Sequence, residues 1–264
     1  MSTKRTTTLA IANQKGGVAK TTTVASIGAA LVELGHKVLI VDLDPQACLT
    51  FSLGIDPEDL ELSVHHVLTK GLDATEVIIE TEEGIDLLPA TIELARAEAD
   101  LLTRTGREHV IRGVVDDLAE KGDEWDYDWI LLDCPPSLGV LTVAALTAAD
   151  GVLIPLQCET LSHRGVGQLL DTVHDVRRFT NKGLAVWGVL PTLYDGRTNH
   201  SRTVLETISE TYDLEVIEPP IPKTIKFAEA PAAGRSILAT SRSSKGAKAY
   251  REVAANLVTR AGRG

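Results

Sequence analysis

Residues 13–23, NQKGGVAKTTT, follow directly on the apolar run TTLAIA. A buried strand that turns through glycines into a helix presents backbone N–H groups and the positive end of a helix dipole, and both attract anions. The usual phosphate-binding loop reads G-x-x-x-x-G-K-[ST]. Here both glycines are absent: Gln14, directly after Asn13, stands at the first position and Ala19 at the second. A second lysine, Lys15, stands five residues before Lys20. The stretch predicts a strand, a phosphate-binding loop and a helix, with an additional lysine to explain.

Short β-rich runs alternate with helical patterns along the rest of the chain. The first strand is expected at 8–12, and 20–34 has apolar residues at helical spacing until Gly35. Further strands are expected at 37–44, 84–90, 128–136, 151–157, 185–192 and 215–222. Further helices are expected at 91–120, 139–148, 162–180, 199–211 and 245–260. The alternation predicts an α/β fold in one domain, 1–264, with a mostly parallel twisted sheet and helices on both faces.

The composition is that of a globular chain. Its 264 residues are 44% apolar, which is enough for a large core. No apolar run has the ~18 residues of a membrane span, and the N-terminus MSTKRTTT has no apolar signal region. The three cysteines lack metal-ligand spacing. We expect them to be buried free thiols of a cytoplasmic protein.

Charge is distributed unevenly along the chain. The net charge is −11, yet residues 181–264 carry 12 Lys+Arg against 8 Asp+Glu, and residues 1–180 carry 14 against 29. The basic last third could form a local face for a phosphate backbone on an otherwise acidic body. The alternative is that these cations are scattered over a solvated surface.

The loop residues have separate expected tasks at a nucleotide. Backbone N–H groups at Gly16 and Gly17 would contact phosphate oxygens, and Lys20 would reach the β- and γ-phosphates. The Thr21 hydroxyl would bind Mg²⁺, and Thr22 would contact the α-phosphate.

Carboxylates follow two of the expected strands. Asp133 ends the apolar run WILLD and is expected in the Mg²⁺ shell, in part through water. Asp42 and Asp44 lie two apart at the end of another strand, on one face. We expect Asp44 to orient the attacking water or accept its proton, and Asp42 to be structural. The alternative for Asp44 is a cap of the turn at Pro45.

These segments together resemble the deviant Walker A ATPases of the ParA/MinD group, and more narrowly the ParA (Soj-like) partitioning ATPases. The resemblance runs along nearly the whole chain. Its segments are KGGVAKTT (15–22), VDLDPQ (41–46), LLPAT (87–91), LLDCPPS (131–137), LYDGRTN (193–199) and FAEAPAAGRSI (227–237).

The resemblance implies a P-loop NTPase that binds ATP and Mg²⁺ and forms a homodimer around two ATP molecules. Lys15 would be the signature lysine that reaches the partner's ATP, as an arginine finger does. It would act in catalysis with Lys20 and Asp44. The nucleotide would contact Lys15, Gly16, Gly17, Val18, Ala19, Lys20, Thr21 and Thr22. Pro222 and Thr224 would lie at the adenine and ribose, although Lys223 and Thr224 depart from the family's usual arginine and asparagine.

Members of this family bind double-stranded DNA without sequence preference as ATP dimers, and a ParB-like partner stimulates hydrolysis. The cations carried over are Arg197, Lys223, Lys226 and Arg235. The resemblance thus implies a nucleoid-associated partitioning ATPase for a chromosome or plasmid.

Other functions of the same loop remain as alternatives. One is a ParA-like protein that positions another cargo on the nucleoid. Another is a MinD-like membrane switch, which would need bulky apolar residues on its last helix. Here the apolar face of that helix includes small alanines and has no Trp or Phe, so we expect it to pack in the core and not to contact a membrane. The presence of Lys15, Lys20, Thr21, Asp44 and Asp133 argues against a nucleotide-bound scaffold without turnover. An iron–sulfur protein would need cysteines in a ligand pattern that Cys134 and Cys158 do not form.

Overall fold

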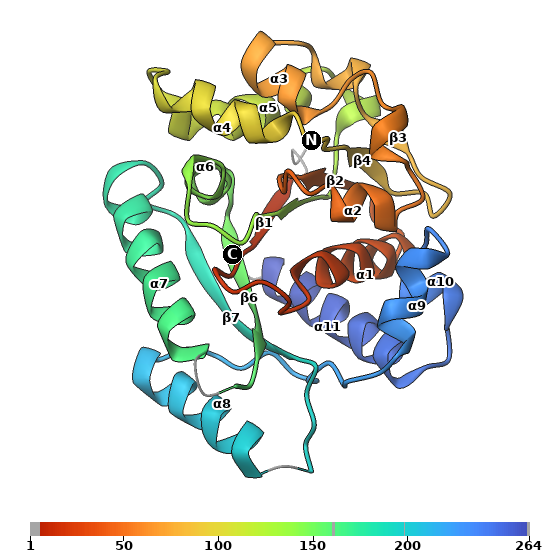
Figure 1. The fold of residues 1–264 in the computed structure, drawn as a ribbon, viewed down its shortest axis with the longest axis vertical. Coiled ribbons are helices and arrows are strands. Elements are labelled where there is room, and N and C mark those ends of the chain that lie inside the picture. The colour runs from red at the N-terminus through yellow and green to blue at the C-terminus, as the bar shows by residue number, and fades with distance from the viewer. Residues whose placement is uncertain (1–5, 160–161, 198, 263–264) are drawn as a thin grey trace.

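The computed structural model describes residues 6–159, 162–197 and 199–262 (Figure 1). A seven-stranded sheet has the order β3-β4-β2-β5-β1-β6-β7, and its strands are parallel except for β3. The strands are β1 Thr7–Ile11, β2 Val38–Asp42, β3 Ile79–Glu80, β4 Asp86–Leu88, β5 Trp129–Asp133, β6 Gly151–Gln157 and β7 Ala185–Thr192. The expected parallel α/β architecture is therefore confirmed, and β1, β2 and β5 lie at its centre.

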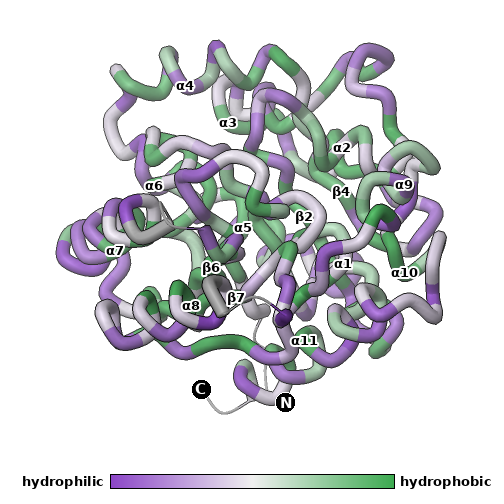
Figure 2. Tube along the Cα trace, turned by 60° about the horizontal axis from the view of Figure 1, so that its bottom comes forward, coloured by the Kyte–Doolittle hydropathy of each residue, from purple (hydrophilic) through white to green (hydrophobic). Residues whose placement is uncertain are grey.

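Helices cover both faces of this sheet (Figure 1). They are α1 Lys20–Glu33, α2 Cys48–Ser52, α3 Val64–Lys70, α4 Leu94–Leu102, α5 Val110–Glu120, α6 Val140–Ala148, α7 Ser162–Phe179, α8 Asn199–Tyr212, α9 Lys226–Ala232, α10 Ile237–Thr240 and α11 Lys245–Ala261. One hydrophobic cluster joins the sheet to α1 and α11, and a second joins it to the helices from α3 to α8. Hydrophilic stretches lie on the outer helices, for example along α7 (Figure 2).

Helix α1 begins inside the phosphate-loop motif and is buried along most of its length. Val24, Ile27 and Leu31, the residues that gave it helical spacing in the sequence, are fully buried. Thr23 and Tyr250 of α11 share a hydrogen bond of 3.0 Å between their hydroxyls. The first turns of α1 are thus packed in the core and hydrogen-bonded to α11.

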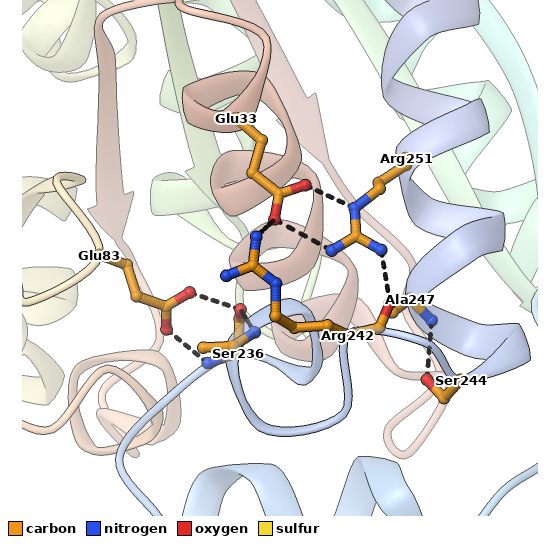
Figure 3. Close-up of polar contacts among 8 residues, drawn as sticks. Glu33, Glu83, Ser236, Arg242, Ser244, Ala247 and Arg251 are labelled. Atoms are coloured by element: carbon orange, nitrogen blue, oxygen red, sulfur yellow. Dashed lines mark hydrogen bonds and ion pairs between the residues drawn. The ribbon is translucent and has the colours of Figure 1, made fainter.

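The C-terminal segment is fastened to the body by two carboxylates (Figure 3). Glu33, in the last turn of α1, accepts hydrogen bonds from Arg251 and pairs with Arg242. Glu83, in the turn between β3 and β4, accepts from the backbone N and the hydroxyl of Ser236 at 2.6 and 2.5 Å. These contacts hold the segment from α10 to α11 against α1 and against the turn between β3 and β4.

Two expected elements differ in the structure. Residues 215–222 form no strand and make only isolated bridges to β7 and its extension. Three of these residues are prolines, which cannot donate a ladder hydrogen bond. The expected helix at 91–120 is divided into α4 and α5, with Gly106 at a positive φ of 72° between them.

Candidate nucleotide site

Asn13 fixes the start of the loop that follows β1. Its side chain is buried, and its Nδ2 donates to the carbonyl of Pro155 in β6 at 2.8 Å. Its Oδ1 accepts from the backbone N of Lys15 at 3.0 Å. Asn13, directly before the loop, therefore ties the loop to the neighbouring strand, and the sequence motif alone does not predict this role.

The middle of the loop is shaped by positive φ angles. Gly17 has a φ of 74° and Ala19 one of 63°, directly before α1. A left-handed alanine costs about 1–2 kcal/mol, and the loop is held there by a 2.9 Å bond from the Thr192 hydroxyl to the carbonyl of Val18. A Cβ added at Gly16 or Gly17 would meet no atom within 4 Å. The space above these two glycines is open to a ligand.

Lys20, Thr21 and Asp133 meet at the start of α1. The Thr21 hydroxyl donates to Asp133 Oδ2 at 2.8 Å, and Lys20 is only 8% exposed. Burial raises the pKa of Asp133 well above its usual range, and the charge of Asp42 adds to this. Asp133 Oδ1 is buried and has no hydrogen-bond partner among the described residues. A buried carboxylate oxygen without a partner beside a threonine hydroxyl fits a hydrated Mg²⁺ ion. Thr22 follows, half-buried, in the same turn.

Asp42 holds the backbone of Asp44 in place through a hydrogen bond. In the sheet register Asp42 lies next to Asp133, and its side chain is fully buried. It accepts hydrogen bonds from the backbone N and the hydroxyl of Thr50 and from the backbone N of Asp44. Burial, opposed by the Thr50 bonds, raises the pKa of Asp42 to about 6. The structural role expected for Asp42 matches this position.

Asp44 lies half-exposed just beyond the end of β2. Its Oδ1 accepts from the backbone N of Gln46 at 3.0 Å, so it does cap the following turn. A carboxylate has further acceptor sites, and one such bond leaves them available for a water molecule. The structure therefore places Asp44 at the same edge of the sheet as Thr21 and Asp133.

The side chain of the additional lysine, Lys15, pairs with an acid that lies outside its own loop. The Lys15 ammonium forms an ion pair with the carboxylate of Glu159, which follows β6. Both side chains are partly exposed, at 32% and 52%. Glu159 is not predicted from the sequence, because nothing in its local pattern sets it apart from other surface acids.

The residues expected at the base and at DNA lie farther along the chain. Pro222 forms a bridge with Tyr194, and Thr224 Oγ1 accepts from the backbone N of Lys226 at 3.3 Å. Lys223 is exposed. The remaining cations are engaged in ion pairs at the surface: Arg197 with Asp195, Lys226 with Glu229, and Arg235 with Glu82.

The cysteines are only partly as expected. Cys134 and Cys158 are buried, whereas Cys48 is exposed. It lies at the start of the short helix α2, in which Leu49 and Thr50 are the buried residues. Among the described residues no group of three His, Cys, Asp or Glu side chains could hold a metal ion alone.

Comparison with known proteins agrees with this geometry. Residues 6–186 match the family described as "AAA domain". The sporulation initiation inhibitor protein Soj of Bacillus subtilis is 42% identical, over 94% of this chain and 98% of Soj. The chromosome partitioning protein ParA of Caulobacter vibrioides is 37% identical, over 96% of this chain and 94% of that protein. This chain belongs to the Soj/ParA family of partitioning ATPases. The resemblance expected from the sequence is thereby confirmed.

A solved structure also resembles this ParA-family chain along its length. It is named cobyrinic acid a,c-diamide synthase from Mycobacterium smegmatis and was determined with bound ADP and magnesium. It is 54% identical, with a TM-score of 0.85, and the match covers 96% of this chain and 94% of that one. In the part of the ParA-family chain that the structure describes, no helix has the length and apolar character needed to cross a membrane.

Replacing Asn13 by Ala is expected to destabilise the fold without removing any phosphate-contacting group. The change leaves the Pro155 carbonyl and the Lys15 N–H without their buried partner. An unsatisfied buried group costs about 1–3 kcal/mol, which urea denaturation of the nucleotide-free protein would measure. Gln14→Ala, at the next, less buried position, serves as the control. Equal stability of the two variants would contradict this role of Asn13.

Proposed function

We propose that this chain is a Mg-dependent ATPase that dimerises on ATP, binds double-stranded DNA without sequence preference, and partitions a chromosome or plasmid together with a ParB-like partner. The observation that carries the proposal is that Lys20, Thr21 and Asp44 all act on Asp133 at the start of α1, next to a loop with open space at Gly16 and Gly17. Family membership supplies the ATP and magnesium, which relatives' structures hold.

Each residue of this set has a task that its surroundings allow. The backbone of 16–20 and the start of α1 bind phosphate oxygens, and Lys20 neutralises their charge. Thr21 and Asp133 hold the metal ion, which shields the phosphate charge when bound. Asp44, held by Asp42 through its backbone N, orients the attacking water.

Lys15 supports the dimer within this proposal. It lies at the rim of the loop in an exposed ion pair with Glu159, and such pairs contribute only about 0–1 kcal/mol. The phosphates of a nucleotide on a second copy can therefore compete for the lysine at little cost. The two chains would then be held together only while ATP is intact, so hydrolysis would release them.

The DNA surface is assigned to the end of β7 and the segment after residue 221. Arg197 is 93% exposed and its pair with Asp195 is open to solvent, so a phosphate can replace that partner. Lys223, Lys226 and Arg235 follow in the chain. A dimer doubles the number of such cations, and binding by phosphate neutralisation weakens steeply with salt.

Arg197→Glu is expected to weaken binding of random-sequence duplex by tenfold or more and to leave ATP affinity unchanged. The reversal removes one phosphate contact and adds a repulsive charge in each chain of the dimer. Anisotropy at fixed salt with Mg-ATP, Mg-ADP and no nucleotide measures it. Lys182→Glu is the matched control, because Lys182 precedes β7 and lies at the opposite edge of the parallel sheet. DNA affinity that falls equally in both variants would move the DNA surface elsewhere.

The acidic charge of residues 1–180 supports the proposal of a ParB-like partner with a basic segment. Residues 1–180 carry 14 basic against 29 acidic residues, so their surface favours a basic segment. Stimulation of ATP turnover by a ParB-like protein, abolished when its basic N-terminal segment is removed, is the test of this step.

The name of the Mycobacterium smegmatis structure suggests a second candidate, amide formation on a corrin acid. If glutamine supplied the nitrogen, a thiolate nucleophile would be needed. Burial instead raises the pKa of Cys134 and raises that of Cys158 to about 11. Burial and then the charge of Asp44 raise the pKa of Cys48 as well. ATP turnover stimulated by cobyrinic acid and glutamine, and not by DNA, would favour this candidate.

Positioning of another cargo on the nucleoid uses the same ATPase and DNA surface, so only the partner distinguishes it. A MinD-like membrane switch is tested by sedimentation with anionic liposomes in Mg-ATP. Binding to liposomes and not to DNA would replace the partitioning proposal.

A further inference from the structure

Glu98 of α4 carries a carboxylate oxygen that the described structure leaves unsatisfied. Leu94, Ala97 and Leu101 form the buried stripe of this helix, and Glu98 lies one turn after Leu94 on the same side. Its Oε1 is shielded from solvent and has no hydrogen-bond partner among the described residues. Asp133 Oδ1, in the nucleotide site, has the same property. A buried acceptor without a partner is costly and needs a reason.

The carboxylate of Glu98 lies against the loop 134–139, which follows Asp133. A Cβ added to Gly139 would come within 2.9 Å of Glu98 Oε1 and 3.4 Å of the Ser137 hydroxyl. Gly139 is the N-cap of α6, and no side chain caps that helix by a hydrogen bond. A negative charge at a helix N-terminus is favourable. Glu98 Oε1 thus lies beside the uncapped start of α6, close to it but without a hydrogen bond to it.

The segment just before α4 is hydrogen-bonded through Thr50 to Asp42, which holds Asp44. The Thr50 hydroxyl donates to Asp42 at 2.7 Å and accepts from the backbone N of Ala90 at 3.0 Å, shortly before α4. Asp42 in turn accepts from the backbone N of Asp44. Helix α4 therefore links the Asp42–Asp44 turn to the loop after Asp133. Burial and then the charge of Asp44 raise the pKa of Glu98, consistent with a position facing that turn.

We propose that Glu98 is a positioning residue for ATP hydrolysis, whose carboxylate braces the loop 134–139 and so keeps Asp133 and Asp44 in register. It acts through the loop and does not touch the nucleotide. The link to hydrolysis rests on the proposed function, whereas the brace itself is a property of the nucleotide-free chain.

The brace is tested in the nucleotide-free full chain by hydrogen exchange at the amides of 137–139, which follow two prolines. Glu98→Ala should speed this exchange by fivefold or more, and Glu98→Gln, which keeps the shape and loses the charge, by less. Asp100→Asn is the matched control, because Asp100 is an exposed acid on the same helix. In the Asp100→Asn variant the amides of 137–139 should exchange at the wild-type rate. Unchanged exchange in Glu98→Ala would overturn the brace.

Gly139→Ala provides an independent second variant. Its methyl group would displace the Glu98 carboxylate, so it should speed exchange as Glu98→Ala does. The double variant should be no faster than either single one, because both remove the same contact. Additive effects would show that the two residues act separately and would contradict the contact.

The link to hydrolysis is tested with Mg-ATP on the same variants. Glu98→Ala should lower kcat about fivefold to tenfold with KM changed less than twofold, and Glu98→Gln should restore part of the loss. Faster exchange with an unchanged kcat would overturn the positioning role. An inactive wild type would instead overturn the proposed function, and the exchange comparison would still decide whether the brace exists.

Discussion

Lys20→Ala is expected to lower the affinity for Mg-ATP by about 100-fold or more. The ammonium of Lys20 lies at the start of α1, 8% exposed, where it also stabilises the charged form of Asp133. Charge-assisted bonds of this kind contribute about 1.5–3 kcal/mol each, and 1.4 kcal/mol is tenfold in affinity. Removing the lysine takes away one or two such bonds to phosphate and leaves Asp133 and Asp42 to repel the nucleotide. Titration with a fluorescent ATP analogue measures the loss.

The control for this prediction is Lys182→Ala, which removes an exposed lysine at the other edge of the sheet. It should bind nucleotide as the wild type does. Thermal unfolding of both variants without nucleotide shows whether Lys20→Ala retains the fold. A folded Lys20→Ala protein with wild-type affinity would mean that the loop 13–23 does not bind phosphate.

The central part of the fold could be predicted because local and global signals agree there. The run before Asn13, the periodicity of 20–34 and the run before Asp133 became β1, α1 and β5. Parallel strands bring their carboxyl ends to one edge, so the sequence predicts that Asp44, Asp133 and the loop lie together. The Thr21–Asp133 bond is the direct expression of that rule.

Elements at the margin could not be predicted, because their form depends on contacts distant in sequence. Residues 215–222 have a β-rich composition that predicts a strand. Their prolines cannot donate ladder hydrogen bonds, so the segment forms only isolated bridges. The partners of Asn13 and Lys15 are Pro155 and Glu159, more than 140 positions away. No local pattern identifies such partners. The role of Glu98 was hidden for the same reason, since its carboxylate meets Gly139 only in the folded chain.

Asp44→Ala is expected to reduce ATP turnover by about 10²–10³-fold, in the range typical of a lost general base, while ATP binding persists. The alanine still has the backbone N–H that donates to Asp42, and the bond from the Thr50 N–H to Asp42 is unchanged. The turn after β2 therefore keeps these hydrogen bonds. Lys20, Thr21 and Asp133 are untouched and still bind Mg-ATP. Without hydrolysis the ATP that joins two chains stays intact, so the dimer should accumulate. Light scattering with Mg-ATP measures its mass, and phosphate release measures turnover.

Asp59→Ala is the matched control for this change, because Asp59 is an exposed acid a short distance along the chain. It should turn over ATP normally and return to a monomer as the ATP is consumed. Addition of Lys15→Ala to Asp44→Ala separates the two parts of the proposal. If Lys15 stabilises the dimer by reaching the partner's nucleotide, the double variant should bind ATP and remain monomeric. A stable dimer in the double variant would assign dimerisation to another surface, and normal turnover in Asp44→Ala would exclude Asp44 as the group that orients the water.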